Sequence, residues 1–416
     1  MPHTVNRRGF LFSAALTALS RGAIGQESSP SFLEPWQPGS LDIHHLAYGR
    51  GNSTFVLCPD GTTILIDAGT TEDSLEVSSA QKPNALIRPG EWIARYILRQ
   101  MRAAGGSHLD YFLLTHIHPD HLGDLGSANP PSPAGDYRLT GVMDVDARVP
   151  IGKLIDRGFP DYDYPLPQEA PFALNYLKYV RSRVRRGEPC ERLQPGRAGQ
   201  IRLVRDPRRY PEFIVRNLAA NGEVWTGNGD GTRRCFPDLK ALSRREYPNE
   251  NLCSAAIRIR YGKFDYYTGG DLTCDTAYGD QPWRDVETPV ARAAGRVDVA
   301  VANHHAYFDA VGPGFIRLLQ PSVFIIPAWY VAHPSIQPLR RMLSRELYAA
   351  DRDVFATNVM AANRAVNNQF ISKLKSLEGH IIVRVAPGGR EFRVLVSSND
   401  DDSDRITIRC GPYPCD

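Results

Sequence analysis

Short apolar runs separated by turn residues mark the first regularly patterned part of the chain. The runs at 53–57 and 62–66 flank a Pro-Asp-Gly turn, which is typical of a β-hairpin. Apolar residues within 91–101 recur at the spacing of one helix face. Another apolar run, at 111–115, has the length of a buried strand and leads directly into a cluster of histidines. The pattern therefore predicts a hairpin, a helix and a strand, in that order.

The patterning weakens between residues 126 and 248. A helix is expected at 170–186, and the polar stretch 221–231 is expected to form a loop. Because few other periodic segments occur here, we expect residues 127–248 to be an insertion on the main fold.

Strand and helix patterns alternate regularly again after residue 254. The runs at 254–261 and 263–268 predict a second hairpin, which turns at Gly262. The later elements are strands at 297–302, 323–327 and 354–357, helices at 315–319 and 335–347, and a last hairpin formed by 380–385 and 391–396. Strands and helices mixed in this way favour a layered α/β architecture.

The composition places the chain among globular proteins. Its 416 residues are 42% hydrophobic and 23% charged, and 49 Lys and Arg against 46 Asp and Glu give a formal charge of +3. These proportions exclude a disordered or collagen-like chain. No apolar stretch reaches the roughly 18 residues that a membrane helix needs. The near balance of charge leaves a nucleic-acid partner unsupported, although not forbidden, by composition.

The N-terminus has the features of an export signal. The pair Arg7-Arg8 precedes a ten-residue apolar run, 10–19, and small residues that offer a cleavage site. The segment resembles the signals of the twin-arginine route, although its first residue is not the usual Ser or Thr. We expect a signal peptide at 1–25, which engages the twin-arginine translocation machinery, and a flexible lead-in at 26–40. The mature protein is then periplasmic or secreted, and the apolar run is too short for stable membrane insertion.

The densest chemistry follows the strand predicted at 111–115. His116, His118, Asp120 and His121 lie within six residues of one another. Imidazole and carboxylate groups are ligands that zinc accepts, and burying four of them unpaired would cost several kcal/mol. A bound metal ion removes that cost because the same groups then form coordination bonds. The segment therefore predicts a metal site at the end of a strand.

This HxHxDH motif after a strand resembles that of the metallo-β-lactamase superfamily. Other parts of the family pattern recur in order, namely Asp67 after the second strand, Gly269-Gly270-Asp271 after a later strand, and His304-His305 after the strand at 297–302. The segment 49–53 (GRGNS), the segment 251–254 (NLCS) and the paired histidine resemble the ComEC-like branch, which is related to the hydrolase domain of DNA-uptake channels. The resemblance implies a four-layer αββα sandwich over 41–396, interrupted by the insertion, with a C-terminal tail at 397–416.

The resemblance also implies a set of metal ligands. Metal 1 would be held by His116 and His118, metal 2 by Asp120, His121 and His305, and both metals by Asp271. The ions would be Zn²⁺, one or two per chain with two favoured, and they would supply a metal-bound hydroxide that Asp120 orients. Either histidine of the 304–305 pair could be the ligand. We expect His305 to bind metal and His304 to be catalytic, donating a hydrogen bond to a developing oxyanion.

One departure from the family pattern concerns metal 1. Many superfamily members use a further histidine between the motif and the bridging aspartate, but this chain has no histidine from 122 to 303. Asn251 or Glu250 would approach that position instead. We therefore expect metal 1 to be weakly bound or more open than in those relatives.

These features together predict an exported metal-dependent hydrolase. Phosphodiesters or related esters are the first substrate class, because the ComEC-like resemblance suggests them and because 181–209 holds ten arginines against three acidic residues. A solvated helix face and loop would explain those arginines equally well. The alternatives are a β-lactam or lactone hydrolase, or a non-catalytic metal-binding accessory protein with the same fold.

Overall fold

The structure is a computed structural model that describes residue 1 and the ranges 31–72 and 76–416. Apart from Met1, the expected signal peptide lies outside these residues, so export and localisation stay predictions. Residues 32–416 form one compact unit, and the description below concerns that unit. Among the described residues, no helix combines the length and the apolar character needed to cross a membrane.

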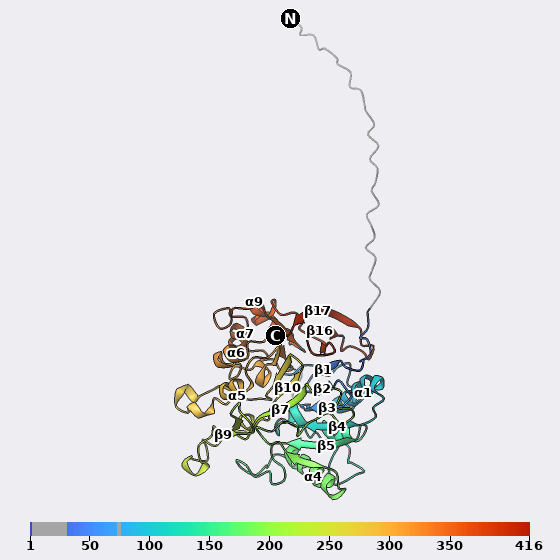
Figure 1. The fold of residues 1–416 in the computed structure, drawn as a ribbon, viewed down its shortest axis with the longest axis vertical. Coiled ribbons are helices and arrows are strands. Elements are labelled where there is room, and N and C mark those ends of the chain that lie inside the picture. The colour runs from blue at the N-terminus through green and yellow to red at the C-terminus, as the bar shows by residue number, and fades with distance from the viewer. Residues whose placement is uncertain (2–30, 73–75) are drawn as a thin grey trace. The chain divides into compact units, whose positions relative to one another are not determined.

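Two large β-sheets form the centre of this unit (Figure 1). One sheet has, in the described residues, the strand order β17-β16-β15-β1-β2-β3-β4-β5-β6. In that order its strands are Ile406–Pro414, Glu391–Ser397, His380–Val385, Leu41–His45, Thr54–Leu57, Thr63–Ile66, Leu109–Leu113, Ile151–Asp156 and Cys190–Arg192. The second sheet has the order β14-β13-β12-β11-β10-β7-β8-β9. Its strands are Asp353–Ala356, Val323–Ile326, Val299–Val301, Phe264–Thr268, Ala256–Tyr261, Phe213–Ala220, Glu223–Trp225 and Thr232–Arg234.

Helices pack on the outer face of each sheet. The helices against the first sheet are α1 (Pro89–Met101), α3 (Val142–Asp146) and α4 (Pro171–Arg185). Those against the second are α5 (Glu287–Ala294), α6 (Pro313–Leu319), α7 (Ile336–Met342) and α9 (Asn368–Ile371), while α2 (Pro119–Leu122) and α8 (Ala361–Val366) are short helices within loops. The expected hairpins and the helices at 91–101 and 170–186 are confirmed.

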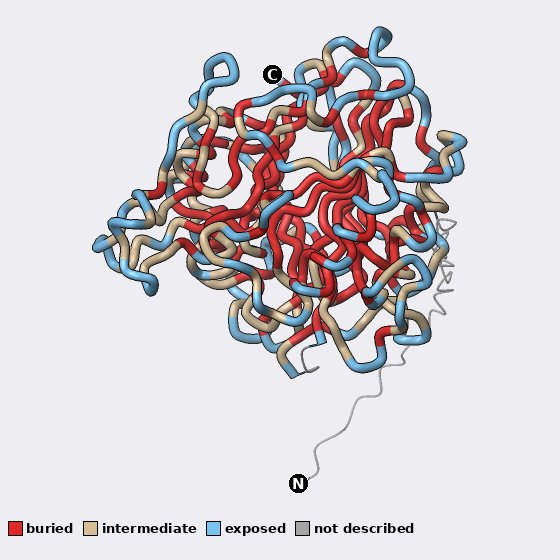
Figure 2. Tube along the Cα trace, turned by 90° about the horizontal axis from the view of Figure 1, so that it is seen from below, coloured by how far each residue is buried: buried red, intermediate tan, exposed pale blue. Residues whose placement is uncertain are grey.

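Separate hydrophobic cores define the layers. Alternate strand residues point to opposite faces of a sheet, so in β2 Val56 joins the core between the sheets and Phe55 joins the core beneath α1. In the second sheet, Val323 and Phe324 divide in the same way between the central core and the core beneath α6. Buried residues accordingly follow the central strands, and exposed residues follow the outer loops (Figure 2). The order helix, sheet, sheet, helix confirms the expected αββα fold class.

The region expected to be an insertion, 127–248, contributes strands to both sheets. It supplies β5 and β6 to the first sheet and β7, β8 and β9 to the second. Three of these strands have only three residues each, which is too short for a readable period-two pattern. The expected tail, 397–416, likewise contains β17, which pairs with β16.

Three buried histidines in the first sheet predict that acid destabilises the fold. Burial lowers the pKa of His45 and of His380 to about 3, and that of His44 well below its ordinary value. Each stays neutral when folded but binds a proton when unfolded, so stability is full above pH ~6.5 and falls as pH drops from there toward about 3. For His45 and for His380 we expect a loss of about 2 kcal/mol each between pH 7.5 and pH 5, and His44 adds to the loss in the same direction.

Chemical denaturation of His45→Phe against the parent protein checks this expectation. The difference in unfolding free energy between the two pH values should shrink by about 2 kcal/mol in the variant. Equal differences in the two proteins would contradict the assignment of His45 as a buried neutral group.

Candidate metal centre

The histidine-rich motif follows the end of a strand in the first sheet and contacts the segments that follow two strands of the second sheet. In the first sheet β4 ends at Leu113, and the motif turns into α2, for which His118 is the residue before the first helical position. In the second sheet β11 ends at Thr268 just before Asp271. β12 is followed by the 3₁₀ turn η6, Asn303–Ala306, which carries the paired histidines.

Two glycines allow the segments to approach one another. Gly270 has a φ of +55°, and a Cβ there would lie 2.8 Å from the Cβ of Thr115. A Cβ on Gly69 would lie 1.6 Å from the backbone oxygen of Asp120. Any larger residue at either position would push the motif away from the loop that faces it.

Four of the expected ligands form one buried cluster. The potential ligand atoms of Asp120, His121, Asp271 and His305 all lie within 4.8 Å of one another. The Nε2 atom of His305 is 3.0 Å from Asp120 Oδ2, and the Nε2 atom of His121 is 3.2 Å from Asp271 Oδ1. Imidazole nitrogens and carboxylate oxygens converging at this spacing form a donor set that fits a metal ion such as zinc.

A second cluster shares one residue with the first. It consists of His116, His118 and Asp271, again with ligand atoms within 4.8 Å of one another. The Nε2 atom of His116 lies 3.1 Å from His118 Nδ1 and 3.7 Å from Asp271 Oδ2. The structure therefore places Asp271 between the two clusters, where the sequence placed a bridging residue. Metal binding by each of these residues remains an inference from this geometry.

Neighbouring groups fix the orientation of the histidine rings. The Nδ1 atom of His121 lies 2.7 Å from Asp67 Oδ2, and the Nδ1 atom of His305 lies 2.9 Å from the carbonyl oxygen of Pro327. Asp67 also accepts hydrogen bonds from the backbone N–H and the hydroxyl of Thr115. Such outer contacts leave Nε2 of both rings facing the cluster, which is the arrangement that metal-ligating histidines need.

His304 and His305 face different surroundings. Both have positive φ angles, 47° and 54°, which let two successive side chains leave the turn in different directions. His305 is in the first cluster. His304 is partly exposed, with Nε2 3.8 Å from Asp271 Oδ2 and Nδ1 2.7 Å from Asp309 Oδ1. His305 therefore lies among the potential ligands and His304 beside them, and the roles expected for them, ligand and catalytic residue, stay predictions.

Glu250 and Asn251, the residues proposed to replace a metal 1 histidine, differ in whether their side-chain oxygens already accept hydrogen bonds. Glu250 accepts hydrogen bonds from the backbone N–H of Ile117 (2.7 Å) and from Arg157 Nε (2.6 Å). Asn251 Nδ2 lies 3.2 Å from His304 Nε2, whereas its buried Oδ1 has no hydrogen-bond partner among the described residues. Asn251 thus has a side-chain oxygen without a partner among the described residues and lies beside His304, whereas Glu250 is already paired.

Carboxylates dominate the charge of the centre. Burial acts to raise the pKa of Asp271, but the histidines around it, His121 foremost, hold that pKa well below its ordinary value. Burial also acts to lower the pKa of His121, and Asp271, Asp120 and Asp67 instead raise it well above its ordinary value. The carboxylates therefore stay ionised and attract a cation into the space between them.

Sequence reasoning missed several contributors to this centre. Arg157, which holds Glu250, has no motif around it, and Asp309 carries no signal beyond its position shortly after the paired histidines. His333 is buried and stacks on His305 with ring centroids 4.8 Å apart. Trp329 packs edge-on against both rings. The only sequence signal for this aromatic packing around His305 was the pair Trp329 and Tyr330, which follows β13.

A comparison with protein families agrees with this reading of the motif. Residues 47–128, which include the first hairpin, α1 and the HxHxDH motif, match the family model described as the metallo-beta-lactamase superfamily. A solved structure of a CmlA beta-hydroxylase mutant is similar at 12% identity and a TM-score of 0.36, over 85% of this chain and 55% of that chain. The chain thus spans little more than half of that structure. No curated protein matches the chain.

Proposed function

We propose that this protein is a metal-dependent hydrolase that binds two zinc ions and cleaves phosphodiesters or related esters. The observation that carries the proposal is the buried position of Asp271 between two clusters of histidine and carboxylate groups. Paired ions in such a site would activate water for attack and stabilise the charge on the departing oxygen. The superfamily match at 47–128 supports the same class of chemistry.

The chain's own residues supply positioning and proton transfer. Asp120 presents Oδ2 at the centre of the first cluster, 3.0 Å from His305, where a carboxylate can orient and accept a proton from a water molecule. His304 is held at Nδ1 by Asp309, its side chain is partly exposed, and its Nε2 lies 3.2 Å from Asn251 Nδ2 and 3.8 Å from Asp271 Oδ2. From there His304 can donate a hydrogen bond to a substrate oxygen that gains negative charge.

Metal analysis joined to a substrate panel tests the proposal. Purified protein reconstituted with zinc should hold close to two ions per chain, hydrolyse bis-p-nitrophenyl phosphate, lose that activity on chelation and regain it with zinc. Less than about 0.3 transition-metal ion per chain after reconstitution would overturn the metal assignment.

The alternatives give different results in the same panel. Robust hydrolysis of nitrocefin, lost in His118→Ala and without phosphodiesterase activity, would favour the β-lactam or lactone hydrolase. Full metal loading with no turnover of a broad ester panel would favour the non-catalytic accessory protein. We rank phosphodiester hydrolysis first because two arginines without partners among the described residues, Arg192 and Arg234, line a cavity near the metal centre.

A further inference from the structure

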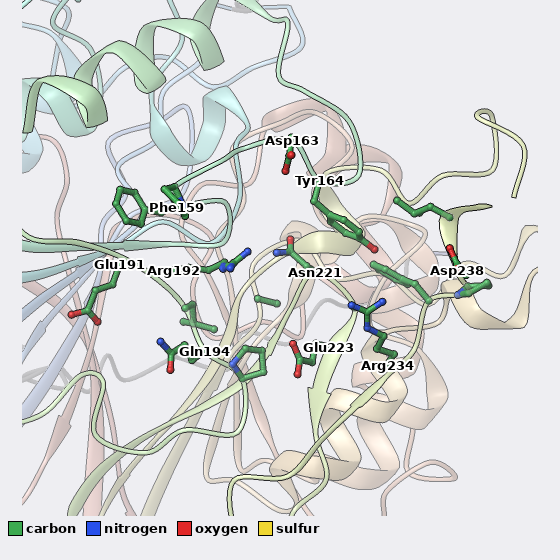
Figure 3. A pocket seen from close by; sticks show the side chains of 18 of the residues that line it. Phe159, Asp163, Tyr164, Glu191, Arg192, Gln194, Asn221, Glu223, Arg234 and Asp238 are labelled. Atoms are coloured by element: carbon green, nitrogen blue, oxygen red, sulfur yellow. The ribbon is translucent and has the colours of Figure 1, made fainter. Parts of the chain in front are cut away.

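A cavity of about 1070 Å³ opens beside the metal centre, between strands that belong to different sheets. Its lining comes from the segment that follows β5, from β6 and the residues after it, and from the segments around β7, β8 and β9, including Phe159, Arg192 and Asn221 (Figure 3). β4, β5 and β6 run parallel to one another, so the segments that follow β5 and β6 leave the first sheet at the same end of its strands as the HxHxDH motif. The whole cavity is built from 159–240, the region expected from sequence to be a peripheral insertion.

One buried arginine connects the cavity wall to the metal centre. The Nη1 atom of Arg157 donates to Asn221 Oδ1 and to the carbonyl oxygen of Tyr164, both at 3.0 Å, and both acceptor residues line the cavity. The same guanidinium binds Glu250, which accepts from the backbone N–H of Ile117 in the motif. The wall between the cavity and the metal centre therefore contains two side chains in series, those of Arg157 and Glu250.

Three cationic side chains of the lining lack partners. Arg192, Arg234 and Lys240 come from three separate segments, and all three are exposed to solvent. Among the described residues, none of their side chains forms an ion pair or a hydrogen bond. Figure 3 shows Arg192 and Arg234 on either side of Asn221, with both guanidinium groups turned toward the space between them.

The acidic residues of the lining are mostly engaged elsewhere. Glu191 binds Lys153 at 2.6 Å and Gln200 at 3.0 Å, and Glu223 accepts a hydrogen bond from the hydroxyl of Thr232. Asp238 accepts from the backbone N–H of Lys240 at 3.0 Å. Asp163 alone offers a carboxylate without such a contact among the described residues, and it lies on the loop that carries Tyr164. The charged groups of the lining that lack a partner among the described residues are therefore mainly cations, foremost the guanidinium groups of Arg192 and Arg234.

Aromatic rings supply the apolar part of the cavity. Phe159 packs against the core on the outer face of the first sheet, whereas Tyr164 and Phe236 pack with the core on the outer face of the second. Phe236 is only 7% exposed and packs edge-on against Trp283, which holds its ring in place. A planar group can stack on such rings while an attached anion reaches the arginines.

We propose that this cavity is a binding subsite for a phosphate or phosphonate group attached to an aromatic ring. Arg192 and Arg234 bind the anion from opposite sides, Lys240 adds positive charge, and the rings of Tyr164 and Phe236 contact the planar part. The view that this group belongs to the ester being cleaved rests on the proposed hydrolase function. The binding site itself does not, because its residues lie outside both metal clusters.

Calorimetric titration with phenylphosphonate tests the subsite. This probe carries a dianion and a ring but no ester bond, so hydrolysis cannot complicate the measurement. In zinc-loaded protein we expect its Kd to rise about tenfold in Arg192→Ala and in Arg234→Ala, since each change removes a charge-assisted hydrogen bond. Arg208→Ala is the matched control, because Arg208 is an exposed arginine outside the lining, and its Kd should stay within about twofold of the parent value.

Further titrations separate the subsite from the metal centre. His116→Ala should keep the tight phenylphosphonate binding, and added inorganic phosphate should compete with the probe in that variant. If His116→Ala abolishes binding while the double variant Arg192→Ala with Arg234→Ala retains it, the probe binds at the metals and the proposal is overturned. Equal losses in Arg192→Ala, Arg234→Ala and the Arg208→Ala control would overturn it as well. A catalytically inactive protein that still shows the arginine dependence would disprove the hydrolase and keep the subsite.

Discussion

Asp120→Asn is expected to lower kcat/KM for the best ester substrate by about 10³-fold. The substitution keeps the size of the side chain but removes the negative charge that lies 3.0 Å from His305 and 3.5 Å from His121. An amide cannot accept a proton from water at neutral pH, and it attracts a cation less strongly than a carboxylate. We therefore expect loss of turnover together with weaker occupancy of the first cluster, measured by steady-state kinetics and metal analysis.

Asp124→Asn is the matched control for this experiment. Asp124 lies in the same loop, but its carboxylate accepts hydrogen bonds from the backbone N–H groups of Glu72 and Leu125 and takes no part in either cluster. Turnover by this variant should stay within about threefold of the parent, and both variants should show native circular dichroism. If Asp120→Asn retained more than about a third of the parent kcat/KM with metal bound, the assigned role of Asp120 would be wrong.

The metal centre could be located from sequence because its chemistry is locally concentrated. His116, His118, Asp120 and His121 follow one buried strand, and four such groups close together leave metal binding as the simplest way to satisfy them. Asp271 and the paired histidines needed the family pattern, since they come from the other sheet. The structure brings these separate segments into two clusters joined by Asp271.

The extent of the sheets could not be predicted from sequence. Strands of three residues such as β6, β8 and β9 give no periodic signal; β6 pairs with β5 across helix α4, and β8 and β9 extend the sheet as short neighbours of β7. The ion pairs between helix α1 and acidic residues near the C-terminus could not be predicted from sequence either. A run of acidic residues such as 400–404 has the pattern of a solvated loop, but Arg99 binds Asp402 at 3.0 Å and Asp404 at 2.8 Å. Charge patterning along a chain does not reveal partners that are about 300 residues apart.

Arg157 is a residue next to the metal centre whose partners could not be predicted from sequence either. Its replacement is the second change for which we expect a large effect. Its side chain is only 1% exposed, and it binds Glu250, Asn221 and the backbone of Tyr164. Burial acts to raise the pKa of Glu250, but Arg157 holds that pKa below its ordinary value. Glu250 is therefore a buried anion whose charge is compensated mainly by one cation.

Arg157→Met should consequently destabilise the protein by about 3–5 kcal/mol in chemical denaturation, because it leaves Glu250 buried without its counter-charge. Zinc binding at the second cluster should weaken as well, since Glu250 holds the backbone of Ile117 between His116 and His118. The double variant Arg157→Met with Glu250→Gln removes the uncompensated charge and should recover part of the lost stability.

A surface ion pair of the same chemistry provides the comparison. Arg186 binds Glu188 at 2.7 Å, and the two side chains are 32% and 33% exposed. Because water screens that pair, Arg186→Met should change the unfolding free energy by less than about 1 kcal/mol. An equally small change in Arg157→Met, or a double variant less stable than Arg157→Met alone, would show that Glu250 does not depend on Arg157 for charge compensation. A large loss in Arg157→Met, partly reversed in the double variant, would establish Arg157 as the residue that holds together the wall between the cavity and the metal centre.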